Sequence, residues 1–466
     1  MSTFEAPIFL HSQIHYDMAK KIQLLLLVVT ILLASPLNAQ FTVSSTPDNA
    51  AVSDSIKPKS RLTIGGYGEA VYKYNFYSDN MFRYSHAEKY ADAKGHGRVD
   101  LPHAVFMIGY DFGKGWTFNA EIEFEHGGTE AAVEVEAEET GEFEKEIERG
   151  GEVALEQFWL QKSFLDSKIN IRLGHIVVPV GGTNNAHLPS EFFGVYRPEG
   201  ENTIIPCTWH ETGIELWGKI KGWRYDVMVM PALNSNMFNA SGWIHDGNAS
   251  PYEFKVANKL AVAARIDNSS VKGLRIGLSG YAGNCFNNDI VTDGKSSKYA
   301  KVKGTVLIGA LDFKYSYGGF LMRGSGLYGH LGDAGLISTY NASQVNSSQS
   351  PYPHTLVGKS AWTAGIEAGY DIFHHLKSTS KALGQKFYLF VRYEYYDSYV
   401  PVADATPYPW SERHCISGGI NYRPIPEIIL KAEGGIRLLR SQYNQEPWFA
   451  IGATWAAFFK KLKFEK

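Results

Sequence analysis

The stretch "WTFNAEIEFEH", Trp116–His126, alternates between apolar and polar residues. The apolar positions are Phe118, Ala120, Ile122 and Phe124, and the positions between them are Asn119, Glu121, Glu123 and Glu125. A period of two places successive side chains on opposite faces of a β-strand. We therefore expect a strand with one apolar face and one charged face.

The same alternation recurs along the chain in segments of about ten to fourteen residues, the length that a tilted membrane-spanning strand needs. Examples are "KFYLFVRYEYY" (386–396), "IILKAEGGIRL" (428–438) and "WFAIGATWAAFF" (448–459). The earliest is "RLTIGGYGEAVY" (61–72), which lacks the G-x-G-x-x-G spacing and the following helix of a dinucleotide site. Its glycines are interpreted as small residues where neighbouring side chains or a packed loop need room, with Glu69 on the polar face.

The connections decide between a soluble β-sandwich and a barrel. Short turns are expected at Gly113–Gly115, Leu165–Lys168, Lys221–Gly222, Asp267–Lys272, Tyr317–Gly319 and Arg423–Glu427. Long polar stretches lie between them at Lys73–Arg98, Gly127–Glu152, Pro179–Cys207, Asn234–Lys255, Cys285–Lys301, Leu331–Gly358 and Ser398–Glu412. This alternation is typical of transmembrane barrels, which have short periplasmic turns and long outer loops. We predict an all-β, antiparallel transmembrane barrel of about 16 strands.

Composition and the N-terminal region agree with an exported barrel. The 466 residues carry a net charge of -3, which argues against a general nucleic-acid surface, and three cysteines cannot complete a disulfide framework. Residues 1–17 are interpreted as an over-extended start, 18–39 as a signal peptide with the apolar run Ile22–Ala34, 40–60 as a polar linker and 61–466 as the barrel. A single N-terminal anchor helix is the alternative for the apolar run.

If the apolar faces meet lipid, the polar faces line the lumen, and their charges are the candidate functional residues. These are Glu121, Glu123, Glu125, Glu211, Glu215 and Asp226 on early strands, Lys259, Arg265, Arg275 and Arg323 on middle strands, and Arg392, Lys431 and Arg437 on late strands. The alternative is that many of them simply pair with cross-strand neighbours, such as Arg392 with Glu394 or Lys431 with Glu433 on adjacent strand positions.

Two connections have unusual compositions. The stretch Pro179–Cys207 is rich in glycine, proline and aromatic residues, so it is expected to pack against the inner wall and to place His187, Glu191 and Arg197 at a constriction. A surface loop is the alternative. The acidic run Glu130–Glu152 is expected to be a solvated outer loop, with bridging to divalent cations or lipopolysaccharide as the other interpretation.

Signals for catalysis are weak. No H-E-x-x-H zinc motif and no G-x-S-x-G nucleophile motif is present. The sequence therefore predicts no enzyme, no cofactor and no metal site.

Three segments resemble the phosphate-selective porin O and P family of Gram-negative outer membranes. They are "IGGYGEAVY" (64–72), "LEQFWLQKSFLDSKINIRLGHIVVPVGG" (155–182) and "HETGIELWGKI" (210–220). The resemblance implies trimeric sixteen-stranded channels, in the best studied of which loop lysines select phosphate. Between Pro179 and Cys207 this chain has Arg197 and no lysine, so phosphate selectivity is not carried over.

The expected function is a porin of the Gram-negative outer membrane that passes small hydrophilic solutes or ions, with anions such as phosphate among the candidates. Its expected partners are lipid, lipopolysaccharide and the solutes, with no nucleic acid. The alternative is a surface-exposed barrel whose long outer loops bind a ligand or a host component.

Overall fold

The computed structural model describes residues 61–459, apart from residues 127–130, 138–142, 150–151, 251–253, 291–296, 344–355, 377–383, 404, 409 and 441–442. The predictions of an over-extended start, a signal peptide and a linker fall on residues 1–60 and lie outside the described residues.

One antiparallel sheet contains all but two of the described strands. Consecutive strands of this sheet pair with each other, except β2 and β3, which both pair with β1. The strands of this sheet are β1 (Leu62–Asn75), β2 (His96–Asp100), β3 (His103–Gly113), β4 (Trp116–Glu125), β7 (Glu152–Phe164), β8 (Ile169–Val177), β9 (His210–Ile220), β10 (Trp223–Pro231), β11 (Leu260–Asn268), β12 (Leu274–Asn284), β13 (Thr305–Tyr317), β14 (Phe320–Leu331), β15 (Ser360–Asp371), β16 (Lys386–Val400), β17 (Glu412–Ile425), β18 (Ile428–Leu438) and β19 (Glu446–Phe459).

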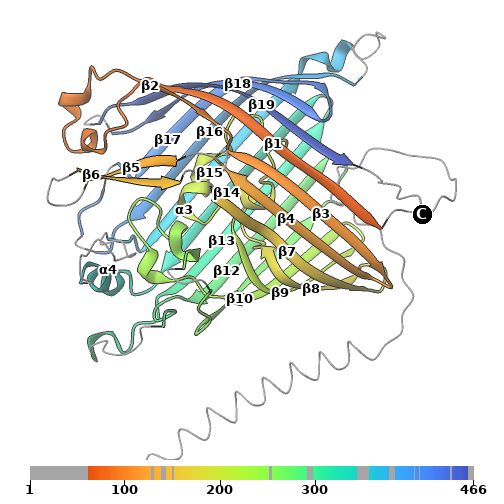
Figure 1. The fold of residues 1–466 in the computed structure, drawn as a ribbon, viewed down its shortest axis with the longest axis horizontal. Helices are drawn as coiled ribbons and strands as arrows, with labels where there is room; N and C mark the ends of the chain where they lie inside the picture. The colour runs from red at the N-terminus through yellow and green to blue at the C-terminus, as the bar shows by residue number, and fades with distance from the viewer. Residues whose placement is uncertain are drawn as a thin grey trace, which may run out of the picture.

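The sheet closes on itself through its first and last strands. Strand β1 pairs with β19 from Ile64 opposite Phe459 to Asn75 opposite Trp448, and the two ribbons lie side by side in Figure 1. Strands β2 and β3 both pair with β1 and are separated by Leu101 and Pro102, where proline supplies no N–H to the ladder. Counted as one interrupted strand, they make a closed barrel of sixteen strands, as predicted.

The outward face of the barrel is apolar. Large exposed aliphatic and aromatic side chains occur on most strands, among them Phe106, Phe158, Leu173, Val229, Leu278, Leu311, Val391, Ile416 and Leu430. Trp223, Tyr317 and Phe320 are also exposed, beside the short turns. An apolar band with an aromatic rim is the surface that a bilayer covers, so the strands of this barrel cross a membrane.

The described helices are short and lie in the long connections. They are α2 (Gly182–Asn185), α3 (Glu199–Ile204), α4 (Ala334–Ala342) and six 3-10 helices: η1 (Met81–Tyr84), η2 (Ala87–Tyr90), η3 (Ser235–Met237), η4 (His245–Asn248), η5 (Ser297–Tyr299) and η6 (Ile372–Leu376). None of them is long and apolar enough to cross a bilayer as a helix.

The main apolar core combines inward side chains of β10–β15 with residues of several outer connections. Trp209, Phe238 and Trp243 are fully buried there, together with Ile204 at the end of α3 and Ile337 of α4. The connections after β8, β10, β12 and β14 therefore share one core, which fixes them against the inner wall.

The acidic run Glu130–Glu152, expected to be a solvated outer loop, contains two paired strands. Strands β5 (Ala131–Ala137) and β6 (Phe143–Arg149) pair in it as a separate two-stranded hairpin at the loop end of the barrel (Figure 1). The sequence "AAVEVEA" (131–137) alternates with a period of two, which is the pattern of a β-strand.

The glycines of the first strand are required by close neighbours, as predicted. A Cβ atom at Gly66 would lie 2.2 Å from the Val105 carbonyl oxygen of β3, and one at Gly68 would lie 3.0 Å from the Trp455 ring of β19. The space is thus taken by adjacent strands. Glu69 is buried on the inner face.

The apolar band predicts that a charged side chain on the outward face lowers the stability of the fold, and that the loss depends on its position along the strand. Val391, 67% exposed in the middle of β16, faces outward. We expect Val391→Arg to lower the free energy of unfolding by ~2–4 kcal/mol, because the charge would lie in hydrocarbon. Val99→Arg on β2, near the loop end, is the matched control and should cost much less. Urea unfolding of the protein in lipid vesicles measures both, and equal costs would contradict the band.

Candidate functional site

The connection Pro179–Cys207, called the constriction loop below, crosses the inside of the barrel. Near its start, Arg265 of β11 donates to the Gly181 carbonyl at 3.0 Å, and the Gly181 N–H donates to Ser279 Oγ at 3.0 Å. At the opposite wall, Lys431 of β18 donates to the carbonyls of Pro189 and Gly194 at 2.7 and 2.8 Å. The loop is therefore tied to strands on both sides of the lumen, as predicted, and is not a surface loop.

The loop holds its own shape through polar contacts. The Glu201 carboxylate accepts hydrogen bonds from the backbone N–H groups of Gly182 at 3.0 Å and Asn184 at 2.8 Å. The Asn184 side chain in turn donates to the Val178 carbonyl at 2.9 Å and accepts from the Trp209 N–H at 2.6 Å. Because these groups are buried, each bond removed would leave an unsatisfied partner.

Aromatic packing adds to these anchors. The Phe193 ring stacks on Phe390 with 5.5 Å between centroids and lies 5.1 Å from Tyr388, both on β16. The Lys431 ammonium also lies 4.3 Å from the centre of the Phe192 ring. The apolar content that predicted a packed loop thus faces the wall of the late strands.

The two pairs that the alternative named are not formed. Arg392 contacts Glu367 at 2.8 Å and Glu433 at 3.5 Å, whereas Glu394 accepts from the backbone N–H groups of Glu199 and Gly200. Lys431 donates to loop carbonyls and forms no ion pair with Glu433 among the described residues. The pairs Arg392–Glu394 and Lys431–Glu433 were therefore wrong. Pairing with cross-strand neighbours is confirmed elsewhere, since Arg392 lies opposite Glu367 of β15 and Arg172 lies opposite Glu215 of β9.

The other predicted lumenal charges point inward and are mostly paired. Their contacts are Arg265 and Arg275 with Asp267 and Asp312, Arg172 with Glu215, Lys255 with Glu211, Arg323 with Glu367 and Glu191, Arg437 with Glu199 and Glu446, His103 with Glu123, and Gln157 with Glu121. Lys259 differs, since it precedes β11 and is exposed.

The three predicted constriction residues lie in separate places. Glu191 contacts Lys314 at 2.8 Å, Arg197 lies 3.0 Å from His103 Nε2, and His187 lies 3.7 Å from Glu156. Among them only Arg197 lines the narrow passage described next.

Three cavities that share lining residues form a series past the loop. The outer one, about 420 Å³, is lined by residues including Tyr77, Arg83 and Arg413. It shares Lys73, Tyr196, Arg197 and Glu199 with a narrow cavity of about 20 Å³. That cavity shares Arg392 and Glu394 with a third, of about 70 Å³, which reaches Lys314 near the β13–β14 turn. The narrow cavity has room for about one water molecule.

The outer cavity carries excess positive charge. Its lining includes six basic side chains (Lys73, Arg83, Arg98, Arg197, Arg413 and Arg437) and three acidic ones (Asp79, Glu199 and Glu446), an excess of three positive charges. Three of the arginines share Glu446 as partner, with Arg83 at 2.5 Å, Arg437 at 3.2 Å and Arg413 at 3.4 Å. Arg83 also keeps two buried guanidinium nitrogens without a hydrogen-bond partner.

Several residues of this path were not predicted. Lys73 and Glu446 fall where strands run beyond the expected bounds, since β1 continues to Asn75 and β19 begins at Glu446. Glu394 was taken only as a pairing partner. Cys415, for which the sequence predicted no role, lines the narrow cavity as a free thiol. The alternation of β16 and β17 marks the inward positions, but no pattern in the sequence shows which of them the loop leaves uncovered.

Known proteins that resemble this chain do so at low sequence identity. No protein-family model matches the chain. An uncharacterized protein of Aquifex aeolicus (strain VF5) is 28% identical over 388 residues, which cover 82% of this chain and 77% of that protein.

Among solved structures, the anion-selective porin from Comamonas acidovorans is 10% identical with a TM-score of 0.48, over 85% of this chain and 99% of that one. The outer membrane channel DcaP of Acinetobacter baumannii is 11% identical with a TM-score of 0.47, over 85% and 97%. Salmonella typhi OmpF is 9% identical with a TM-score of 0.48, over 85% and 97%. At these TM-scores the likenesses assign no function to this chain.

The contact between Glu199 and Arg437, 2.5 Å, generates a pH prediction. Burial opposes the charge on Glu199, but Arg437 outweighs it and lowers the pKa of Glu199 from 4.5 to about 2. The stabilisation of the fold by the contact between Glu199 and Arg437 is therefore complete above pH 4.5, and it is lost as the pH falls to about 2. We expect Glu199→Gln to lower the free energy of unfolding by ~1–3 kcal/mol at pH 7 and by much less near pH 2.5.

Denaturant titrations at the two pH values measure this difference. Glu412→Gln is the matched control, because Glu412 pairs at 2.9 Å with the exposed Arg440 and such a surface pair contributes ~0–1 kcal/mol. A Glu199→Gln cost that stays constant with pH would contradict the proposed contact.

Proposed function

We propose that the protein is a porin of the Gram-negative outer membrane that passes small hydrophilic solutes and ions by passive diffusion. The observation that carries the proposal is the series of three cavities, each with charged side chains in its lining, inside a closed barrel with an apolar exterior. Charged and hydroxyl groups line this path, which suits water and ions and disfavours lipophilic molecules.

The narrow cavity limits the size of the solute. The constriction loop contributes Tyr196, Arg197 and Glu199 to it, and the wall contributes Arg392 and Glu394. With room for about one water molecule, this passage favours small inorganic ions over sugars and larger metabolites. The expected unit conductance is accordingly low for a barrel of sixteen strands.

The outer cavity supports a preference for anions. Its excess of three positive charges raises the local concentration of anions at the mouth. The narrow cavity is balanced, with Lys73, Arg197 and Arg392 against Glu199, Glu394 and Glu433. We therefore expect the outer cavity to select anions over cations, without distinguishing one small anion from another. Phosphate belongs to this class, but the only basic residue of the loop is Arg197.

Reversal potential under a salt gradient tests the proposal. The chain from Gln40 onward, in a planar bilayer, should show stepwise conductance. The sign of its reversal potential should indicate that anions permeate more readily than cations. Arg98 is exposed and lines the outer cavity, so Arg98→Glu removes two of the three excess charges. We expect it to reduce the chloride-to-potassium permeability ratio roughly two-fold.

The matched control is Lys303→Glu, which makes the same charge change at an exposed position that lines none of the three cavities. An equal shift in both variants would assign selectivity to overall charge. A cation-selective wild type would contradict the anion preference. A silent bilayer with folded protein would favour the alternative, ligand binding by the outer loops.

Assembly as a homotrimer and contact with lipopolysaccharide remain predictions. Cross-linking of the protein in native membranes tests the first of them, because trimers would give a discrete band at three times the chain mass.

A further inference from the structure

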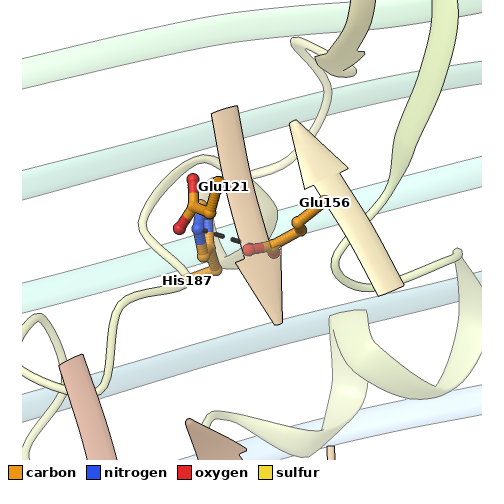
Figure 2. A group of neighbouring side chains, drawn as sticks. All are labelled: Glu121, Glu156 and His187. Atoms are coloured by element: carbon orange, nitrogen blue, oxygen red, sulfur yellow. Dashed lines mark ion pairs between the residues drawn. The ribbon is translucent and has the colours of Figure 1, made fainter. Parts of the chain in front are cut away.

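A buried cluster of two carboxylates and an imidazole lies between the constriction loop and the early strands. Glu121 comes from β4, Glu156 from β7 and His187 from the loop. One ligand atom from each lies within 4.8 Å of the other two. Figure 2 shows the three side chains gathered at one place, with the contact between His187 and Glu156 drawn as a dashed line.

Each of the three side chains has one buried ligand atom without a hydrogen-bond partner. Glu121 and Glu156 are 1% exposed, yet Glu121 Oε1, Glu156 Oε1 and His187 Nε2 are buried without one. The second oxygens are engaged, since Gln157 donates to Glu121 and Tyr67 donates to Glu156 at 3.5 Å. No lysine or arginine lies within ion-pair distance of either carboxylate among the described residues. Buried unpaired carboxylates are costly, so the arrangement requires a cation or a proton.

The spacing favours a metal ion. His187 Nε2 and Glu156 Oε1 are 3.7 Å apart, which is longer than a hydrogen bond. Two ligand atoms that each lie ~2.1 Å from a tetrahedral ion are separated by roughly 3.4 Å. The donor set also selects the ion, because imidazole suits zinc and similar transition metals better than magnesium or calcium.

The backbone aims Glu156 at this cluster. The pairing of β4 with β7 shifts register between Glu121 and Ile122, where Gln157 and Leu155 are the partners and Glu156 has no opposite residue. A β-bulge of this kind re-aims one side chain of a strand. Leu155 and Phe158 remain exposed on the outward face while Glu156 turns inward.

We propose that Glu121, Glu156 and His187 bind one divalent transition-metal ion, zinc among the common ones, which ties the constriction loop to strands β4 and β7. Water completes the coordination. The loop is already held at the late strands by Lys431 and Glu433, so the ion secures its opposite side. The site thereby sets how firmly the narrow passage is held, and it stands independently of which solute passes.

Direct binding tests the site. The chain from Gln40, without a histidine tag, is stripped with chelator, refolded in detergent and titrated with ZnCl₂, with MgCl₂ and CaCl₂ as competing probes. We expect about one zinc ion per chain, measured by calorimetry and by elemental analysis after gel filtration, and little binding of magnesium or calcium. Glu121→Gln and His187→Asn should each weaken zinc binding at least ~10-fold.

The matched control is His330→Asn, an exposed histidine on β14 that should leave zinc binding unchanged. Circular dichroism and heat-dependent gel mobility establish that each variant has folded. Equal zinc binding in wild type and Glu121→Gln would overturn the proposal, and so would the absence of binding in folded wild type. The latter result would assign a shared proton to the carboxylate pair.

A second measurement reports on the loop. Amide hydrogen exchange near His187 should slow at least ~10-fold on addition of zinc to wild type, with no change in Glu156→Gln. An exchange rate near His187 that does not change with zinc in the wild type would overturn the proposal that the ion holds the loop against the strands. Neither measurement depends on conductance, so failure of the metal site and failure of the channel are distinguishable.

Discussion

Closure of the sheet through β1 and β19 is the constraint on which the rest of the structure depends. In a bilayer every backbone N–H and C=O must be satisfied by the protein, and only a closed sheet does this with strands. Closure divides each strand into a lipid face and a lumen face with a period of two. The inward position of charges on regular stretches of the strands follows from that division, including those at Glu121, Arg265 and Arg392.

The second determinant is competition for partners inside the barrel. A lumen wide enough for sixteen strands would leave its charged groups in water, but the constriction loop brings backbone donors and acceptors to them. Glu394 binds N–H groups of α3, Lys431 binds loop carbonyls, and Glu199 binds Arg437. The charges that narrow the passage are therefore also the charges that hold the loop in place, which couples the stability of the loop to the shape of the path.

The sequence predicted the strand number, the alternation of turns and loops, the inward charges and the entry of the loop into the lumen. These follow from local rules of period and composition. It named the wrong partner for Arg392, because Glu367 lies directly opposite on β15 and the loop, far away in the sequence, supplies N–H groups to Glu394. It missed Glu156, because a β-bulge breaks the period there. It also missed the β5–β6 hairpin, because the charge of the run obscured its alternation.

The central claim is that ions pass the narrow cavity between the loop and the late strands, and Cys415 offers a direct test because its thiol lines that cavity. The measurement is single-channel current in nitrate salt before and after silver ion, in a chain with Cys207→Ser and Cys285→Ser. A lasting block that disappears when Cys415→Ser is added is the predicted result. Current that is unaffected by silver, or that is blocked equally without Cys415, would contradict this path.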